Sequence, residues 1–245
     1  LGVTATNYAT GLGVTFFQGA AEIAPWDRAT RIGRRTVLGV EHVLASSAIP
    51  MFFPAVVIDG EWYADGCIRL STPLSPAIHM GAQRIVAIAF RHPAAPVPAP
   101  GAMAPSPPYP STADTAGVLL DALFLDALES DLERTLRINE TLRLLPRALI
   151  DAHATPLRQV NVLVLRPSVD PSLLVVKSLD RFPATVRHLF RGLGASDDSG
   201  WDLLSYLAFE GEYTTRLMEL GYADTSARAD EIRAFLAAPG APTEP

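Results

Sequence analysis

The stretch Trp62–Leu74, WYADGCIRLSTPL, holds a lone aspartate, Asp65, at the end of a strand-like run and directly before Gly66. A carboxylate in such a place can act as a general base if a hydroxyl comes within hydrogen-bond reach. Glycine lets the backbone turn sharply and lets another group approach closely. Asp-Gly is also an ordinary turn dipeptide. Spacing alone therefore leaves two interpretations of Asp65 open, a turn-former and a catalytic base.

Other reactive side chains form no recognisable site in the sequence. Cys67 is the only cysteine, which excludes an internal disulfide, and we interpret it as a buried, inert thiol. Ser46 and Ser47 stand at a predicted helix end, where small hydroxyls usually bond the backbone. The histidines (His42, His79, His92, His153 and His188) have no metal-ligand spacing and no partner in a serine motif. No G-x-G-x-x-G or P-loop occurs, so a nucleotide-binding site has no support in the sequence.

The composition narrows the class of protein. The chain has 245 residues, 49% of them hydrophobic, which is enough for a substantial core. The net charge of −6 and the scattered basic residues argue against nucleic acid as a partner. No apolar run reaches the roughly 18 residues that a transmembrane helix needs, and we see no signal peptide. We therefore expect a cytoplasmic or peripheral membrane protein.

The elements that must position Asp65 come first in the chain. Gly2–Tyr8 and Val14–Phe17 have the pattern of two paired strands, and Thr36–Ala48 that of a short buried helix. The dipeptide Asp59-Gly60 predicts a type I′ hairpin turn. The strand that follows this turn leads directly to Asp65.

Helix punctuation follows the Asp65 turn. Ser75 can cap a helix, Pro76 fits its first position, and Gly81 fits just past its end. Ile85–Phe90 is nearly all apolar, which is typical of a strand buried on both faces of a sheet. The order strand, helix, strand predicts a layered α/β fold.

The second half of the sequence is mainly helical. Eight of the 21 prolines fall in residues 93–110, which predicts an extended loop. Asp114–Leu145 has the pattern of one long amphipathic helix with a leucine face, and Gln159–Pro167 that of a buried strand. The leucines of that face are Leu125, Leu128, Leu132, Leu136 and Leu142. Further helices are expected over Pro183–Leu193, Trp201–Leu220 and Ser226–Ala238.

The words ASSAIPMFFP, IDG, YADG and PLSPAIHMGAQRIV, all within Ala45–Val86, closely resemble the patatin-like phospholipase family. Upstream, VTATNYATG, VTFF and WDRATR resemble the same family, and two later helical stretches are similar to the C-terminal region of a bacterial branch. The resemblance implies an α/β layered fold with a central sheet flanked by helices, incomplete at the N-terminus, plus a helical C-terminal extension.

The resemblance also implies a Ser-Asp dyad that hydrolyses lipid acyl esters without metal or cofactor. Asp65 holds the position of the base, Gly66 that of the turn glycine, and Cys67 the third position of the family's D-G-G word. In the family the nucleophile is a serine in a G-x-S-x-G motif, which is preceded by a glycine-rich oxyanion loop. The 245 residues of this sequence contain neither the motif nor the loop. We therefore expect the C-terminal portion of a patatin-like domain, inactive and poorly soluble alone. Contact with a membrane surface is left open.

This interpretation predicts four segments. Residues 1–92 form the C-terminal part of the catalytic domain, 93–113 a Pro-rich loop, 114–238 a helical region with one buried strand at 159–166, and 239–245 a disordered tail. The alternative is a non-catalytic binding or scaffolding protein on a decayed patatin-like fold. Cys67 and the absent serine motif favour that alternative if no such motif precedes Leu1 in the gene.

Overall fold

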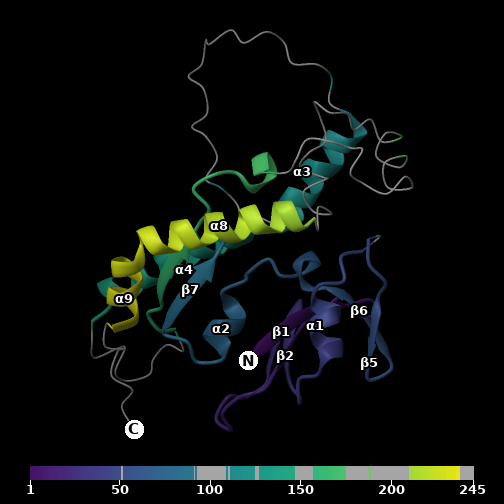
Figure 1. The fold of residues 1–245 in the computed structure, drawn as a ribbon. Helices are drawn as coiled ribbons and strands as arrows, with labels where there is room; N and C mark the ends of the chain where they lie inside the picture. The colour runs from purple at the N-terminus through teal and green to yellow at the C-terminus, as the bar shows by residue number, and fades with distance from the viewer. Residues whose placement is uncertain are drawn as a thin grey trace. The chain divides into compact units, whose positions relative to one another are not determined.

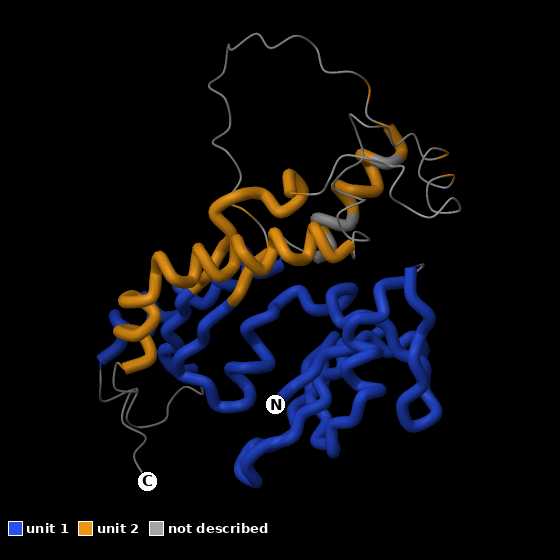
Figure 2. The backbone as a smooth tube through the Cα atoms, viewed as in Figure 1, with its two compact units in different colours: residues 1–87, 126–163, 239–245 blue, residues 88–125, 164–238 orange. Residues whose placement is uncertain are grey.

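A computed structural model describes residues 1–50, 52–90, 92, 109, 111–124, 127–146, 157–174, 188, 192 and 210–237. The chain divides into two compact units (Figure 2). The first unit comprises residues 1–87, 126–163 and 239–245, and the second comprises residues 88–125 and 164–238. The first unit contains Asp65 and the sheet that positions it.

A six-stranded sheet forms the centre of the first unit (Figure 1). Its strands are β1 (Gly2–Asn7), β2 (Gly13–Phe17), β3 (Trp26–Arg28), β4 (Arg31–Arg35), β5 (Val56–Ile58) and β6 (Glu61–Asp65), in the order β3-β4-β2-β1-β6-β5. β2 and β4 pair in parallel, and the other neighbours pair antiparallel. The expected pairing of the first two strands is confirmed.

The hairpin between β5 and β6 is also confirmed. Asp59 has φ 53° and Gly60 has φ 82°, so both central residues of the turn adopt the left-handed conformation of type I′. The turn sets the register Val56↔Tyr63 and thereby delivers β6 alongside β1.

Helix α1 (Val40–Ser46) covers one face of this sheet. The core on this face consists of Ala5, Val14, Phe16, Ala45, Ile58 and Tyr63. Within the helix His42 and Ala45 are buried, whereas Val40 is 72% exposed. The prediction of a buried helix over 36–48 is therefore wrong in both length and burial, because a helix of about two turns offers just one face to the sheet.

The opposite face is covered by the 3₁₀ turn η1 (Gly66–Ile68) and helix α2 (Ser75–His79). Trp26 stacks between Phe17 of the sheet, at 5.2 Å between ring centroids, and His79 of α2, at 4.9 Å. Cover on both faces of the sheet confirms the layered α/β fold. The expected cap of α2 is corrected, since Leu74 and not Ser75 is the N-cap residue.

The long helix predicted over 114–145 is two helices, α3 (Thr112–Phe124) and α4 (Ala127–Leu144). The predicted leucine face of α4 is confirmed at Leu142, which is 2% exposed, and is wrong at Leu136, which is 54% exposed, while Leu128 and Leu132 are half-buried. The buried residues of α4 are Asp131, Thr135, Asn139 and Leu142. Three of these four side chains are polar, and each bonds a backbone group, so hydrogen bonding decides which face is buried.

Strands β7 (Arg84–Ile88) and β8 (Asn161–Leu165) form a separate two-stranded sheet. The prediction that the segment Ile85–Phe90 is buried on both faces is wrong, because Ile88 is 71% exposed and Phe90 is 75% exposed. A sheet of two strands has open edges and too little area to be covered on both faces.

The described residues of the second unit are largely helical. This unit contains α3, the 3₁₀ turn η2 (Pro171–Leu174), α8 (Gly211–Ala227) and α9 (Ala229–Ala237). The helix predicted to end at Leu220 continues through Gly221 to Ala227. Apart from Tyr109, His188 and Gly192, the expectations for 93–110 and 183–193 lie outside the described residues.

Candidate active site at the Asp65 turn

The backbone of Asp65 is held from two sides. Its N–H donates to the carbonyl of Ala48, just after α1, at 2.9 Å. Its own carbonyl accepts from the hydroxyl of Thr6, on β1, at 2.8 Å. Because the sheet register pairs Asp65 with Ala5, and paired residues share a face, the Asp65 side chain lies on the α1 face of the sheet.

Gly66 is required here by close packing. A Cβ atom at Gly66 would lie 2.3 Å from the carbonyl oxygen of Thr4 and 2.8 Å from its carbonyl carbon. Gly66 does not have a left-handed φ. Glycine is needed at this position because it has no side chain. The turn after β6 can therefore press directly against β1.

The Asp65 carboxylate is partly buried and interacts with its own turn. Oδ1 accepts the Cys67 main-chain N–H at 2.9 Å, which caps η1. Burial raises the pKa of Asp65, and hydrogen bonds from the Cys67 N–H and thiol oppose that shift. Within the described residues no cationic side chain forms an ion pair with this carboxylate. A desolvated carboxylate without a counter-ion binds a proton more strongly than a solvated one, as a general base must.

Cys67 does not have the chemistry of a nucleophile. Burial and the neighbouring Asp65 carboxylate both raise the pKa of its thiol. The thiolate is the reactive form of cysteine, and these surroundings disfavour it.

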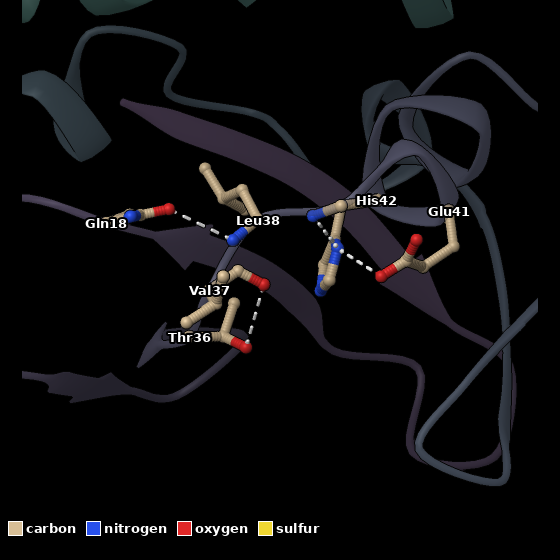
Figure 3. Close-up of polar contacts among 7 residues, drawn as sticks. Gln18, Thr36, Val37, Leu38, Glu41 and His42 are labelled. Atoms are coloured by element: carbon tan, nitrogen blue, oxygen red, sulfur yellow. Dashed lines mark hydrogen bonds and ion pairs between the residues drawn. The ribbon is translucent and has the colours of Figure 1, made fainter.

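Helix α1 supports the Asp65 turn from its C-terminal end, and its own N-terminus is fixed by polar contacts (Figure 3). The Gly39 N–H donates to His42 Nδ1 at 3.0 Å, and Gln18 Oε1 accepts the Leu38 N–H at 3.1 Å. Since Nδ1 accepts a hydrogen bond, the proton of the neutral ring lies on Nε2. Glu41 Oε1, 3.2 Å from the same Nδ1, therefore contacts a nitrogen that has no proton to donate unless the ring is charged.

The remaining sequence candidates have structural contacts. The Ser47 hydroxyl donates to the carbonyls of Val43 and Leu44 and so closes the end of α1. His79 stacks on Trp26, and His153 lies outside the described residues. In the described part of the chain, no group of histidine, cysteine and acidic residues has the arrangement of a metal site. No described helix is long and apolar enough to cross a membrane.

Sequence reasoning missed a second polar feature of the first unit. On the sheet face opposite Asp65, a hollow is lined by Arg28, Arg31 and Arg69. These arginines are scattered in the sequence, and the sheet and the η1 turn bring them together. The spacing of Arg28 and Arg31 around a two-residue β-turn is the one signal that could have indicated a shared location.

The family model described as Patatin-like phospholipase matches residues 9–78, less than a third of the chain. These residues are patatin-like. The matched segment runs from the turn after β1 into α2 and includes the whole Asp65 turn. No curated protein and no solved structure matches the chain. The patatin-like match suggests a lipid hydrolase, whereas the bacterial branch and the likeness of the C-terminal helices stay predictions.

Proposed function

We propose that this chain supplies the catalytic base, Asp65, of a lipid acyl hydrolase that uses a Ser-Asp dyad. The serine is not in a G-x-S-x-G motif of these 245 residues, so it belongs to another part of the intact protein. The substrate class is a lipid acyl ester, and the reaction needs no metal or cofactor.

One observation supports this proposal above the others. Within the patatin-like segment, Asp65 is partly buried, burial raises its pKa, and its hydrogen bonds come from Cys67, two residues away. An aspartate that served only to stabilise the fold would be expected to pair with a cation or with distant backbone groups. Asp131 is such an aspartate, since it accepts the Leu74 N–H at 2.9 Å and faces Arg31.

In the proposed reaction, Asp65 first accepts a proton and then returns it. Asp65 takes the proton of the serine hydroxyl as the serine oxygen attacks the acyl carbonyl carbon. The C–O bond to the lipid alcohol then breaks, and that alcohol leaves with the proton from Asp65. Water attacks the acyl-serine with Asp65 again as base, which releases the fatty acid and restores the serine.

The test compares Asp65→Asn with Asp59→Asn in the protein expressed from its whole reading frame. Both changes remove one negative charge beside a glycine, but Asp59 lies at the hairpin turn between β5 and β6. We expect Asp65→Asn to lower hydrolysis of a short-chain nitrophenyl ester by about 10²–10⁴-fold, the usual contribution of a general base. Asp59→Asn should retain the wild-type rate. Equal rates for Asp65→Asn and wild type would exclude Asp65 as the base.

The scaffolding alternative keeps one specific observation in its favour. The Cys67 thiol donates a hydrogen bond to the Asp65 carboxylate and thereby lowers the pKa of Asp65. A catalytic serine would have to share this carboxylate with the thiol. A fluorophosphonate probe distinguishes the two functions, because it labels an activated serine. Labelling of the intact protein supports the hydrolase, and a protein that takes no label supports a scaffold. The 245 residues alone should take no label.

A further inference from the structure

The arginine hollow lies on the face of the sheet away from Asp65. It is lined by Thr4 and Thr15 of the sheet, by Ser75 at the start of α2, and by Arg28, Arg31 and Arg69. Thr4 is adjacent to Ala5, so its side chain points to the opposite face from that of Asp65. The Asp65 turn and the hollow are therefore separate sites in one unit.

The hollow collects positive charge without matching negative charge. Three arginines line it, and no carboxylate is among its lining residues. This local excess contrasts with the net charge of −6 for the whole chain. Desolvation lowers the pKa of the nearby His79, and the charges of Arg28, Arg31 and Arg158 lower it further. Of these causes, the arginine charges would favour an anion nearby, whereas desolvation would not.

Two of the guanidinium groups have unused donors. Nε and Nη1 of Arg31 are buried and have no hydrogen-bond partner. The Arg69 side chain forms no hydrogen bond or ion pair with the described residues, and its Nη2 lies over Gly11. Buried N–H donors without an acceptor are costly, so an oxyanion that approaches Arg31 would gain bonds that the protein leaves unmade.

The nearest carboxylate is already engaged. Asp131 raises the pKa of Arg31 by its charge, but its Oδ2 accepts the Leu74 N–H, and the Ser75 N–H also bonds this carboxylate. Burial lowers the pKa of Arg31 more than Asp131 raises it. The charge of Asp131 therefore offsets only part of the cost of burying the positive charge of Arg31.

The backbone leaves room for the arginines to converge. Gly13 pairs with Arg31 across β2 and β4. A Cβ at Gly13 would lie 3.3 Å from Arg69 Cβ and 3.5 Å from Arg31 Cγ. The absent side chain at Gly13 allows the stems of both arginines to lie against the strand, one on each side.

We propose that this hollow binds a phosphate group. Guanidinium groups match the oxygens of phosphate in geometry and charge, and the hydroxyl of Ser75 can donate a further hydrogen bond. The hollow is small and partly open to solvent, so it does not suit a long acyl chain. The phosphate is either free or the monoester of a lipid headgroup. The site does not depend on the proposed function of Asp65.

The experiment measures binding of inorganic phosphate to the full chain by calorimetry at constant ionic strength. Wild type should bind with a Kd below about 1 mM, and Arg69→Gln should weaken binding about tenfold or more. Arg69 and Arg28 are exposed, so Arg28→Gln and Arg69→Gln keep the test valid if Arg31→Gln fails to fold. Arg137→Gln, an exposed arginine of α4, is the control with the same change in charge. Asp65→Asn should bind phosphate as wild type does, which separates this site from the catalytic proposal.

A vesicle assay then identifies the source of the phosphate. Arginine-dependent co-sedimentation with phosphatidylcholine vesicles that contain phosphatidic acid, and none with phosphatidylcholine alone, supports a lipid headgroup monoester. Phosphate binding without co-sedimentation supports the free anion. The proposal is overturned if wild type does not bind phosphate, or if Arg69→Gln and Arg137→Gln bind it equally well.

Discussion

Two Asp-Gly dipeptides lie six residues apart, and the structure uses them in opposite ways. Asp59-Gly60 forms an open hairpin turn in which both residues have a left-handed φ and a Cβ on Gly60 would touch nothing within 4 Å. Asp65-Gly66 ends β6 with Asp65 at φ −48°, and a Cβ on Gly66 would run into the Thr4 carbonyl. The first glycine supplies a backbone conformation, and the second supplies space.

The difference extends to the two aspartates. Asp59 serves the turn through its tolerance of positive φ. Asp65 has an ordinary φ, and its carboxylate caps the next turn in a partly desolvated place. The dipeptides are identical, but their aspartates differ. Asp59 can be replaced by another residue that tolerates a positive φ, whereas the carboxylate of Asp65 lies in a partly desolvated place. Four substitutions test this contrast.

Gly66→Ala should have the largest effect on stability. The new methyl group meets the backbone of β1, which cannot move aside as a flexible side chain could. We expect the free energy of unfolding in a urea titration to fall by about 3 kcal/mol. Gly221→Ala is the control, because that glycine lies within α8 with nothing within 4 Å, and alanine should stabilise a helix interior there. A similar free energy of unfolding for Gly66→Ala and wild type would refute the packing argument.

Gly60→Ala should destabilise less, by about 1–2 kcal/mol, through the cost of a left-handed φ without any steric clash. The same urea titration measures it. A loss as large as that of Gly66→Ala would mean that the two glycines do not differ as described.

Asp65→Asn should change how stability depends on pH. Because burial raises the pKa of Asp65, the folded state holds a proton that the unfolded state has already lost. The stabilisation is complete below the ordinary pKa of 3.8 and is lost as pH rises through the raised pKa. Asp65→Asn should therefore gain stability relative to wild type as pH rises through this window. A constant difference between the two proteins from pH 3 to pH 8 would contradict the burial of an uncompensated charge.

Asp59→Asn should have the smallest effect, within about 0.5 kcal/mol at neutral pH, since asparagine adopts the left-handed conformation as readily as aspartate. Thermal unfolding of the variant tests this expectation. A loss well beyond that range would assign the Asp59 carboxylate a role that the turn geometry does not reveal.

Local signals in the sequence were sufficient for the turns around Asp65. The hairpin at Asp59-Gly60 follows from the φ values that its residues tolerate, and the end of α2 follows from Gly81, which has φ 100°. Each of these depends on a few neighbouring residues. The close approach of Gly66 to Thr4 could not be read this way, because it depends on two strands separated by sixty residues.

Burial was harder to predict than secondary structure. The leucine pattern of α4 did not reveal that Asp131, Thr135 and Asn139 share the buried face of the helix with Leu142. Apolar residues also suggested a strand buried on both faces at 85–90, where the structure has one member of a two-stranded sheet. The hydropathy of a segment does not tell which other elements of the fold pack against it. The arginine hollow was missed for a related reason, because its charges converge across strands.

Asn139 has one more consequence for the fold. Its side-chain amide donates to the Val160 carbonyl at 2.7 Å and accepts the Val160 N–H at 3.0 Å. The side chain thus satisfies both main-chain groups at the entrance of β8, as a peptide unit of an adjacent strand would. At Val160, the residue before β8, the chain therefore has no free main-chain donor or acceptor to recruit a strand of a second molecule.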